Sequence, residues 1–139
     1  MTTLYQDVGG FDRLLALSRT WHRLCLEDPV AAHPFEHALH PQHDERLAAY
    51  LAEALGGPPL YTAGYGDESS MQRVHAGNGV HEELDEACLD AFDRALAQVG
   101  ITGDAGARVS AYFRRATIAQ RRYAEGPHLV PDDLVIDTA

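Results

Sequence analysis

The sequence contains no lysine, so its positive charge comes from eleven arginines alone, set against 21 aspartates and glutamates in 139 residues. The formal net charge is −10. Binding to nucleic acid or to an anionic membrane surface needs a concentrated basic patch, because the partner presents phosphate groups. This charge balance therefore predicts that neither is a partner.

Long apolar runs and cysteine motifs are also lacking. The longest apolar stretch is the six residues Leu47 to Ala52, whereas a membrane-spanning helix needs roughly 20. No charged segment followed by an apolar run opens the chain, so no signal peptide is expected. The two cysteines, Cys25 and Cys88, lie far apart and form no CxxC unit. We expect free thiols in a cytoplasmic protein.

The residues that are present indicate helices. Apolar residues make up 45% of the chain, enough for a sizeable core at this length. They recur every three or four positions, and glycine or proline pairs interrupt the pattern. This spacing predicts long helices over 11–27, 44–55, 82–99 and 104–123, with shorter ones over 2–7 and 69–75. No alternating strand pattern is present, so the predicted fold is all-α.

We expect one domain over residues 1–125, followed by an acidic C-terminal tail over 126–139. Residues 30–42 are predicted to form a bend, because prolines interrupt regular helix there, and residues 56–68 a loop. Asp104 is expected to be the N-cap of the last long helix, and Ile118 to lie on its buried face.

Histidine is abundant, with eight residues in all. Four of them lie within eleven positions: His33, His37, His40 and His43. Neutral imidazole is the commonest metal ligand, so this cluster is a candidate divalent-metal site, although surface residues of a proline-interrupted connection explain it better. His75 ends a short predicted helix just before two glycines. From there one ring nitrogen can reach into a pocket while a backbone carbonyl orients the other.

An ordered set of short motifs runs through most of the chain, from about Tyr5 to Arg122. Its members are Val8-Gly9-Gly10, Glu27-Asp28-Pro29, Leu55-Gly56-Gly57-Pro58-Pro59-Leu60-Tyr61, Met71-Gln72-Arg73-Val74-His75 and Phe92-Asp93-Arg94-Ala95-Leu96. In this order and spacing the set resembles the truncated globins, most closely their second group.

The resemblance implies a two-over-two helical sandwich around haem b, with His75 as the proximal ligand of the iron. It also implies a distal face made by Trp21, His22, Phe35, His43, Leu47, Tyr50 and Cys88. Phe35 matches the aromatic residue that stacks on the porphyrin, and Leu47 the apolar side chain over the iron. Arg46 and Arg73 match positions where a cation pairs with a haem propionate, and Tyr61 would add a hydrogen bond there.

Three distal positions depart from the family pattern. His22 stands where the family usually has tyrosine, Cys88 where it usually has tryptophan, and His43 where many members have a small residue. An imidazole in such a pocket can stabilise bound oxygen, take a proton from peroxide, or bind the iron itself. Cys88 should leave room for a larger ligand.

Three functions remain open on these residues. The first is a haem enzyme acting on oxygen, peroxide or nitric oxide, with His22 and His43 as catalytic groups and a separate, unidentified reductant. The second is a non-catalytic sensor or carrier of a diatomic ligand. The third, outside haem chemistry, is a helical interaction module or divalent-metal binder that uses the histidine-rich connection.

Overall fold

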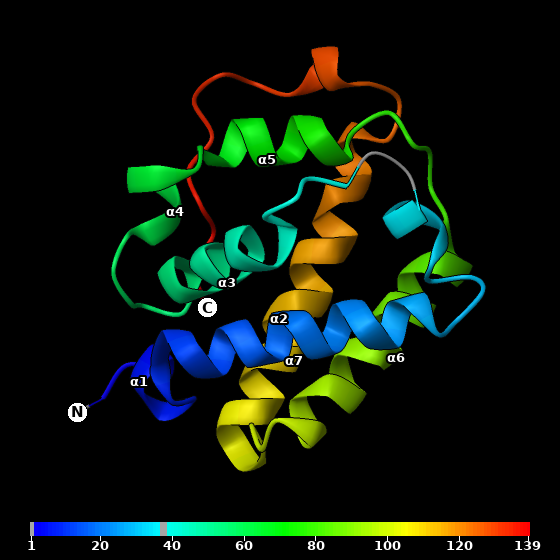
Figure 1. The fold of residues 1–139 in the computed structure, drawn as a ribbon. Helices are drawn as coiled ribbons and strands as arrows, with labels where there is room; N and C mark the ends of the chain where they lie inside the picture. Colours follow the sequence, from blue (N-terminus) through cyan, green and yellow to red (C-terminus); the bar gives the residue numbers. More distant parts are fainter. Residues whose placement is uncertain (1, 37–38) are drawn as a thin grey trace.

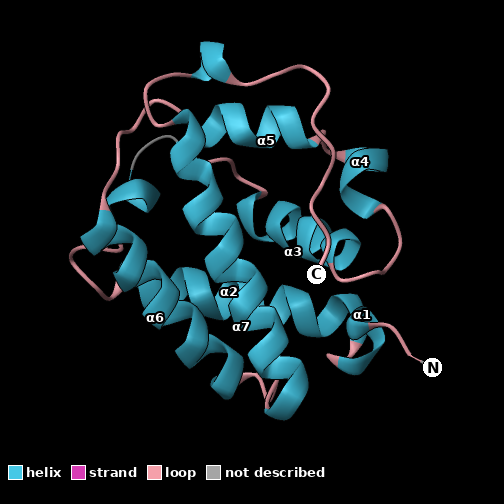
Figure 2. Cartoon of the chain, turned by 180° about the vertical axis from the view of Figure 1, so that it is seen from behind, coloured by secondary structure: helices cyan, strands magenta, loops and turns pink. Residues whose placement is uncertain are grey.

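The computed structural model describes residues 2–36 and 39–139, and every regular element in these ranges is helical, as the sequence predicts (Figure 2). No helix within these ranges is both long and apolar enough to cross a membrane. The α-helices are α1 (Leu4–Asp7), α2 (Gly10–Leu26), α3 (His43–Ala54), α4 (Leu60–Gly64), α5 (Glu68–His75), α6 (Glu82–Gln98) and α7 (Gly103–Ala119). Short 3-10 turns are η1 (His33–Glu36), η2 (Gln120–Tyr123) and η3 (Pro127–Leu129).

The first two helices meet at a pair of glycines. Thr3 caps α1, since its hydroxyl accepts from the backbone N–H of Gln6 at 3.1 Å. Gly9 and Gly10 have φ values of 102° and 79°, a left-handed conformation that costs little only for glycine. The chain turns sharply there, and α2 starts in a new direction.

Four long helices form the body of the protein (Figure 1). Helix α2 packs against α3 on one side and α6 on the other, and α6 packs against α7. This is the two-over-two arrangement of two helix pairs. The rings of Phe92 on α6 and Phe113 on α7 stack with centroids 3.8 Å apart, and Leu14, Leu17 and Val109 are fully buried. The core therefore lies between α2, α3, α6 and α7.

Helix α4 forms where a loop was expected. Its first-turn N–H groups need acceptors, and the sequence just before it offers only two prolines. The acceptor comes instead from α3: the Glu53 carboxylate accepts from the backbone N–H of Thr62 at 2.9 Å and from its hydroxyl at 2.8 Å. The helix thus depends on a tertiary cap that local sequence patterns do not show.

Two expectations for α7 were wrong. Asp104 lies inside the first turn, because the extended residue Thr102 takes the N-cap position and Gly103 begins the helix. The side chain of Ile118 is 42% exposed rather than buried. It belongs to the last turn of α7, on a side that stays open to solvent.

The segment after η2 packs back onto the helices, and both ribbon views show it passing α5 and ending beside α3 (Figures 1 and 2). The Ser69 hydroxyl donates to the carbonyl of Pro131 at 2.6 Å, and the Tyr112 hydroxyl donates to that of Asp137 at 2.8 Å. The backbone N–H of Ala139 donates to the carbonyl of Ala54 at 2.9 Å. This segment therefore fastens α5 to the body of the protein.

Candidate functional site

Four of the expected distal residues have rings in mutual contact. Trp21 and His22 come from α2, Phe35 from η1, and His43 from the first residue of α3. Phe35 stacks on His22 with ring centroids 4.8 Å apart and meets Trp21 edge-on at 5.2 Å. The ring of His43 lies 5.6 Å from that of His22 and 5.5 Å from that of Phe35. The packing of α2 against α3 therefore brings both histidines to one place.

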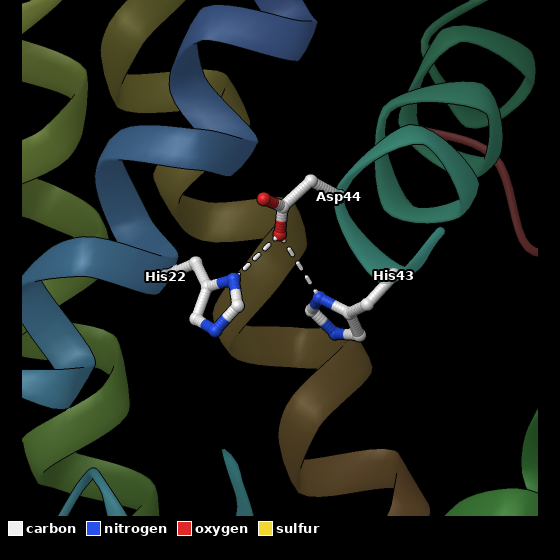
Figure 3. Close-up of side chains that lie close together, drawn as sticks. All are labelled: His22, His43 and Asp44. Carbon is white, nitrogen blue, oxygen red and sulfur yellow. Dashed lines mark hydrogen bonds and ion pairs between the residues drawn. The ribbon is translucent and has the colours of Figure 1, made fainter. Parts of the chain in front are cut away.

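Asp44, which the sequence reasoning missed, joins the two histidines (Figure 3). Its Oδ1 lies 2.9 Å from Nδ1 of His22 and 3.2 Å from Nδ1 of His43. These three side chains are the group within the described ranges whose ligand atoms lie close enough together to hold a metal ion. Asp44 follows His43 directly in the sequence, but its bond to His22 depends on how α3 docks on α2.

The Asp44 contacts decide which ring nitrogens remain free. An ionised carboxylate can only accept hydrogen bonds, so Nδ1 of each histidine is the donor. In a neutral ring, Nε2 then carries no proton and has a lone pair. Figure 3 shows that in both rings this second nitrogen lies on the side away from Asp44. The cluster thus presents two basic nitrogens rather than two hydrogen-bond donors.

Burial shifts the proton equilibrium of His43. Desolvation lowers its pKa below the ordinary 6.5, Asp44 opposes this, and the neighbouring His22 and His75 lower it further. His43 is therefore neutral at pH 7. Because His75 contributes to this shift, the end of α5 lies in the same electrostatic environment as the His22–Asp44–His43 cluster.

The lowered pKa of His43 predicts a pH-dependent stability. Between its folded and unfolded pKa values the unfolded chain binds the extra proton, so protonation favours unfolding. We expect His43 to contribute its full share to the free energy of unfolding of the haem-free chain above about pH 6.5, and this free energy to fall as the pH drops below that value. Urea unfolding at several pH values measures this, and His43→Gln should flatten the profile over that interval. If the free energy of unfolding of the variant falls with pH as steeply as that of the wild type, other groups cause the effect.

His75 is the last residue of α5, which Asp67 caps through the backbone N–H of Ser70 at 2.7 Å. Its Nδ1 lies 2.8 Å from the carbonyl oxygen of Met71, one turn earlier on the same helix. A carbonyl only accepts, so Nδ1 carries the proton and Nε2 is free to bind a metal. The side chain is exposed, and so are the neighbouring apolar residues Val74 (77%) and Val80 (58%). An oriented imidazole among uncovered apolar groups fits haem iron.

Trp21 and Cys88 contact each other through the backbone of α6. The indole Nε1 donates to the carbonyl oxygen of Cys88 at 2.9 Å, and Trp21 is only 8% exposed. Leu47 is partly buried against the same core cluster. These expected distal residues thus lie at the edge of the α2–α3–α6 core.

Tyr50 makes a different contact from the one expected. Its hydroxyl donates to the carboxylate of Glu68 at 2.6 Å, and the side-chain amide of Gln72 donates to the same carboxylate at 3.0 Å. Glu68 is 6% exposed and was not anticipated from the sequence. Burial raises the pKa of Tyr50, which keeps its phenol protonated as the donor. Tyr50 therefore links α3 to α5, the helix that carries His75.

Removing the Tyr50 hydroxyl should destabilise this link. Tyr50→Phe leaves the buried Glu68 carboxylate short of one charge-assisted hydrogen bond, so we expect a loss of about 1.5–3 kcal/mol in the free energy of unfolding. Tyr65→Phe is the matched control, since the Tyr65 hydroxyl has no hydrogen-bond partner among residues 2–36 and 39–139. Urea unfolding compares the two, and equal losses would contradict this assignment.

The residues expected near the propionates have protein partners here. The Arg46 guanidinium lies over the rings of Tyr65 and Tyr61, at 5.3 and 5.9 Å, and donates to the carbonyl of Tyr65 at 3.3 Å. Tyr61 is buried, and its ring meets that of Tyr50 edge-on at 5.3 Å. Arg73 pairs with Asp132 of the C-terminal segment. A propionate would share these guanidinium groups with their protein partners, whose hydrogen bonds come from Nη2 of each arginine.

The described members of the expected four-histidine cluster, His33, His40 and His43, do not form a joint metal site. His37 lies outside the described residues. His40 is exposed, and its Nδ1 accepts from the backbone N–H of Gln42 at 3.0 Å. Of the described members, only His43 belongs to a group with metal-binding geometry, and its partners come from other positions.

Several solved structures of known proteins share this fold. The fold is similar to that of the group II truncated haemoglobin from Bacillus anthracis, with a TM-score of 0.76 at 21% identity, covering 87% of this chain and 91% of that one. It is also similar to the haemoglobin of Chloroflexus aurantiacus (TM-score 0.74, 25% identity, 86% and 98% covered). The fold is similar as well to that of the group II 2-on-2 haemoglobin of Agrobacterium tumefaciens, with a TM-score of 0.73 at 25% identity, covering 87% of this chain and 95% of that one. Among curated proteins none matches.

The sequence itself matches the model of a protein family. The model of the bacterial-like globins matches residues 3–118, which include α1 to α6 and nearly all of α7. The matched segment contains His75 and the whole His22–Asp44–His43 cluster. The chain therefore belongs to the bacterial-like globins, a family of haem-iron proteins that bind small ligands.

Proposed function

We propose that this chain binds haem through Nε2 of His75 and uses His22 and His43, both held by Asp44, as acid–base groups toward a small ligand of the peroxide or oxygen class. The observation that carries the proposal is the shared Asp44 carboxylate, which accepts from Nδ1 of both rings. In a neutral ring bonded in this way, Nε2 has a lone pair, which suits proton abstraction better than hydrogen-bond donation to bound oxygen.

Haem binding is supported by the surroundings of His75. The Met71 carbonyl fixes the ring and its tautomer, which is how protein metal sites usually orient a ligating histidine. Exposed Val74 and Val80 offer apolar surface beside it. When bound, haem would supply a Lewis-acidic iron that holds the ligand and exchanges electrons with it.

The histidines would handle the protons. Nε2 of His43 is unprotonated at pH 7, because its pKa is lowered, and can accept a proton from a peroxide. The same nitrogen can then return that proton to the departing oxygen. Asp44 stabilises the imidazolium that forms in between and holds both rings in the required tautomer. Phe35 stacks on the His22 ring and Trp21 on the His43 ring, which holds both rings in place.

Absorption spectra test this proposal. Full-length protein loaded with haem should show a Soret band in the ferric, ferrous and carbon monoxide-bound forms, and it should consume hydrogen peroxide above the rate of free haem. Reversible oxygen binding with no peroxide turnover would leave only a carrier or sensor role. A six-coordinate ferrous spectrum that His22→Ala or His43→Ala converts to five-coordinate would show that a distal Nε2 binds the iron instead. Protein that stays colourless would refute haem binding.

A further inference from the structure

Two thiols lie outside the proposed chemistry. Cys25 on α2 and Cys88 on α6 are the only cysteines of the chain, and both are free. Helices α2 and α6 pack directly against each other. The indole of Trp21 bonds to the Cys88 carbonyl, and Cys25 lies four residues beyond Trp21 on the same face of α2. The helix packing thus places the two cysteine side chains together.

The two thiols interact with each other but differ in their surroundings. Cys25 is fully buried, and Cys88 is partly exposed. The interaction between the two side chains lowers the pKa of Cys88 and, together with burial, raises that of Cys25. Cys88 is the more accessible partner, as expected of an attacking thiol. Cys25 is placed to react with it next.

We propose that Cys25 and Cys88 form a redox-active dithiol that peroxide oxidises to an intramolecular disulfide between α2 and α6. The Cys88 thiolate attacks one peroxide oxygen, the O–O bond breaks, and the departing hydroxide takes up the proton that Cys88 had released, giving water and a sulfenic acid. The Cys25 sulfur then attacks the Cys88 sulfur. The S–S bond forms, the S–O bond breaks, and the oxygen leaves as water with the Cys25 proton. Two electrons pass from sulfur to peroxide.

The consequence is a covalent link beside the distal cluster. Trp21 and His22 lie on the same helix as Cys25, one turn before it. A disulfide would fix this part of α2 covalently to α6, to which the Trp21 indole and the Arg23 guanidinium already donate hydrogen bonds, at the Cys88 carbonyl and the Gln98 side chain. Peroxide would thus alter the helix that carries a proposed catalytic group.

Intact mass measurement tests the proposal on the full chain. After brief treatment with hydrogen peroxide and alkylation, we expect the mass to fall by two hydrogens and both alkylatable thiols to be lost. Dithiothreitol should restore them, and dilution should not change the yield, because the bond is intramolecular. His75→Gly should behave in the same way, which separates this reaction from any failure of haem binding. Thiols that remain alkylatable, or disulfide-linked dimers alone, would overturn the proposal.

Single variants separate the roles of the two cysteines. In Cys25→Ala, peroxide should leave Cys88 as a sulfenic acid that dimedone traps. In Cys88→Ala, the buried Cys25 should be oxidised at least about tenfold more slowly than Cys88 is. Equal reactivity of the two thiols would contradict the proposed order of attack. The wild-type mass measurement stands even if one variant does not fold.

Discussion

Replacing His75 by glycine is expected to lower haem affinity by more than about tenfold, since losing even a residue that only orients a metal ligand costs about 10- to 100-fold. His75 is the exposed imidazole at the end of α5 whose Nδ1 is already bonded to the Met71 carbonyl. Its Nε2 therefore needs no rearrangement to bind iron. Titration of haem into the full-length chain, followed at the Soret band, measures the loss.

A matched substitution distinguishes ligand loss from general destabilisation. His128→Gly removes another exposed histidine, in the C-terminal segment, and should leave haem affinity unchanged. Added imidazole should restore part of the Soret band in His75→Gly, because it can replace the missing ring. Unchanged haem affinity in His75→Gly would mean that the iron is held elsewhere, and the proposed function would fail with it.

The placement of His75 could be predicted because it depends on local sequence. The segment from Met71 to His75 combines a helical stretch with glycines that end it, and the Met71 carbonyl lies one turn from the ring it orients. Residues four apart on a helix always lie on one face. For the same reason, periodic apolar spacing was enough to predict the long helices and the all-α fold.

Asp44 and Glu68 could not be predicted, because their roles depend on contacts between helices. Asp44 reads from the sequence as an acidic residue at the start of a helix, a common place for one. Only the docking of α3 on α2 brings it to His22. Glu68 similarly reads as a first-turn residue of α5, until the hydroxyl of Tyr50 on α3 reaches it. Helix α4 was missed because its cap, Glu53, belongs to another helix.

The distal histidines should matter most for peroxide turnover. His22→Ala or His43→Ala is expected to slow peroxide consumption by more than about tenfold, within the range of about 10²–10⁴ that general acid–base catalysis contributes. The fold decrease in peroxide consumption of the double variant should be smaller than the product of the two single decreases, because both rings share the Asp44 carboxylate. His40→Ala, which changes an exposed histidine outside the cluster, should leave the rate unchanged.

Asp44→Asn separates acid–base chemistry from simple filling of the pocket. The amide keeps the shape of the carboxylate and its oxygen can still accept from both rings, but it carries no negative charge to stabilise the imidazolium that forms during proton transfer. In serine proteases the same change lowers the rate by about 10⁴. We therefore expect Asp44→Asn to lose peroxide turnover by more than about tenfold while haem content and the Soret band stay unchanged. A variant that turns over peroxide like the wild type would mean that Asp44 only positions α3, and that the histidines do not act as bases.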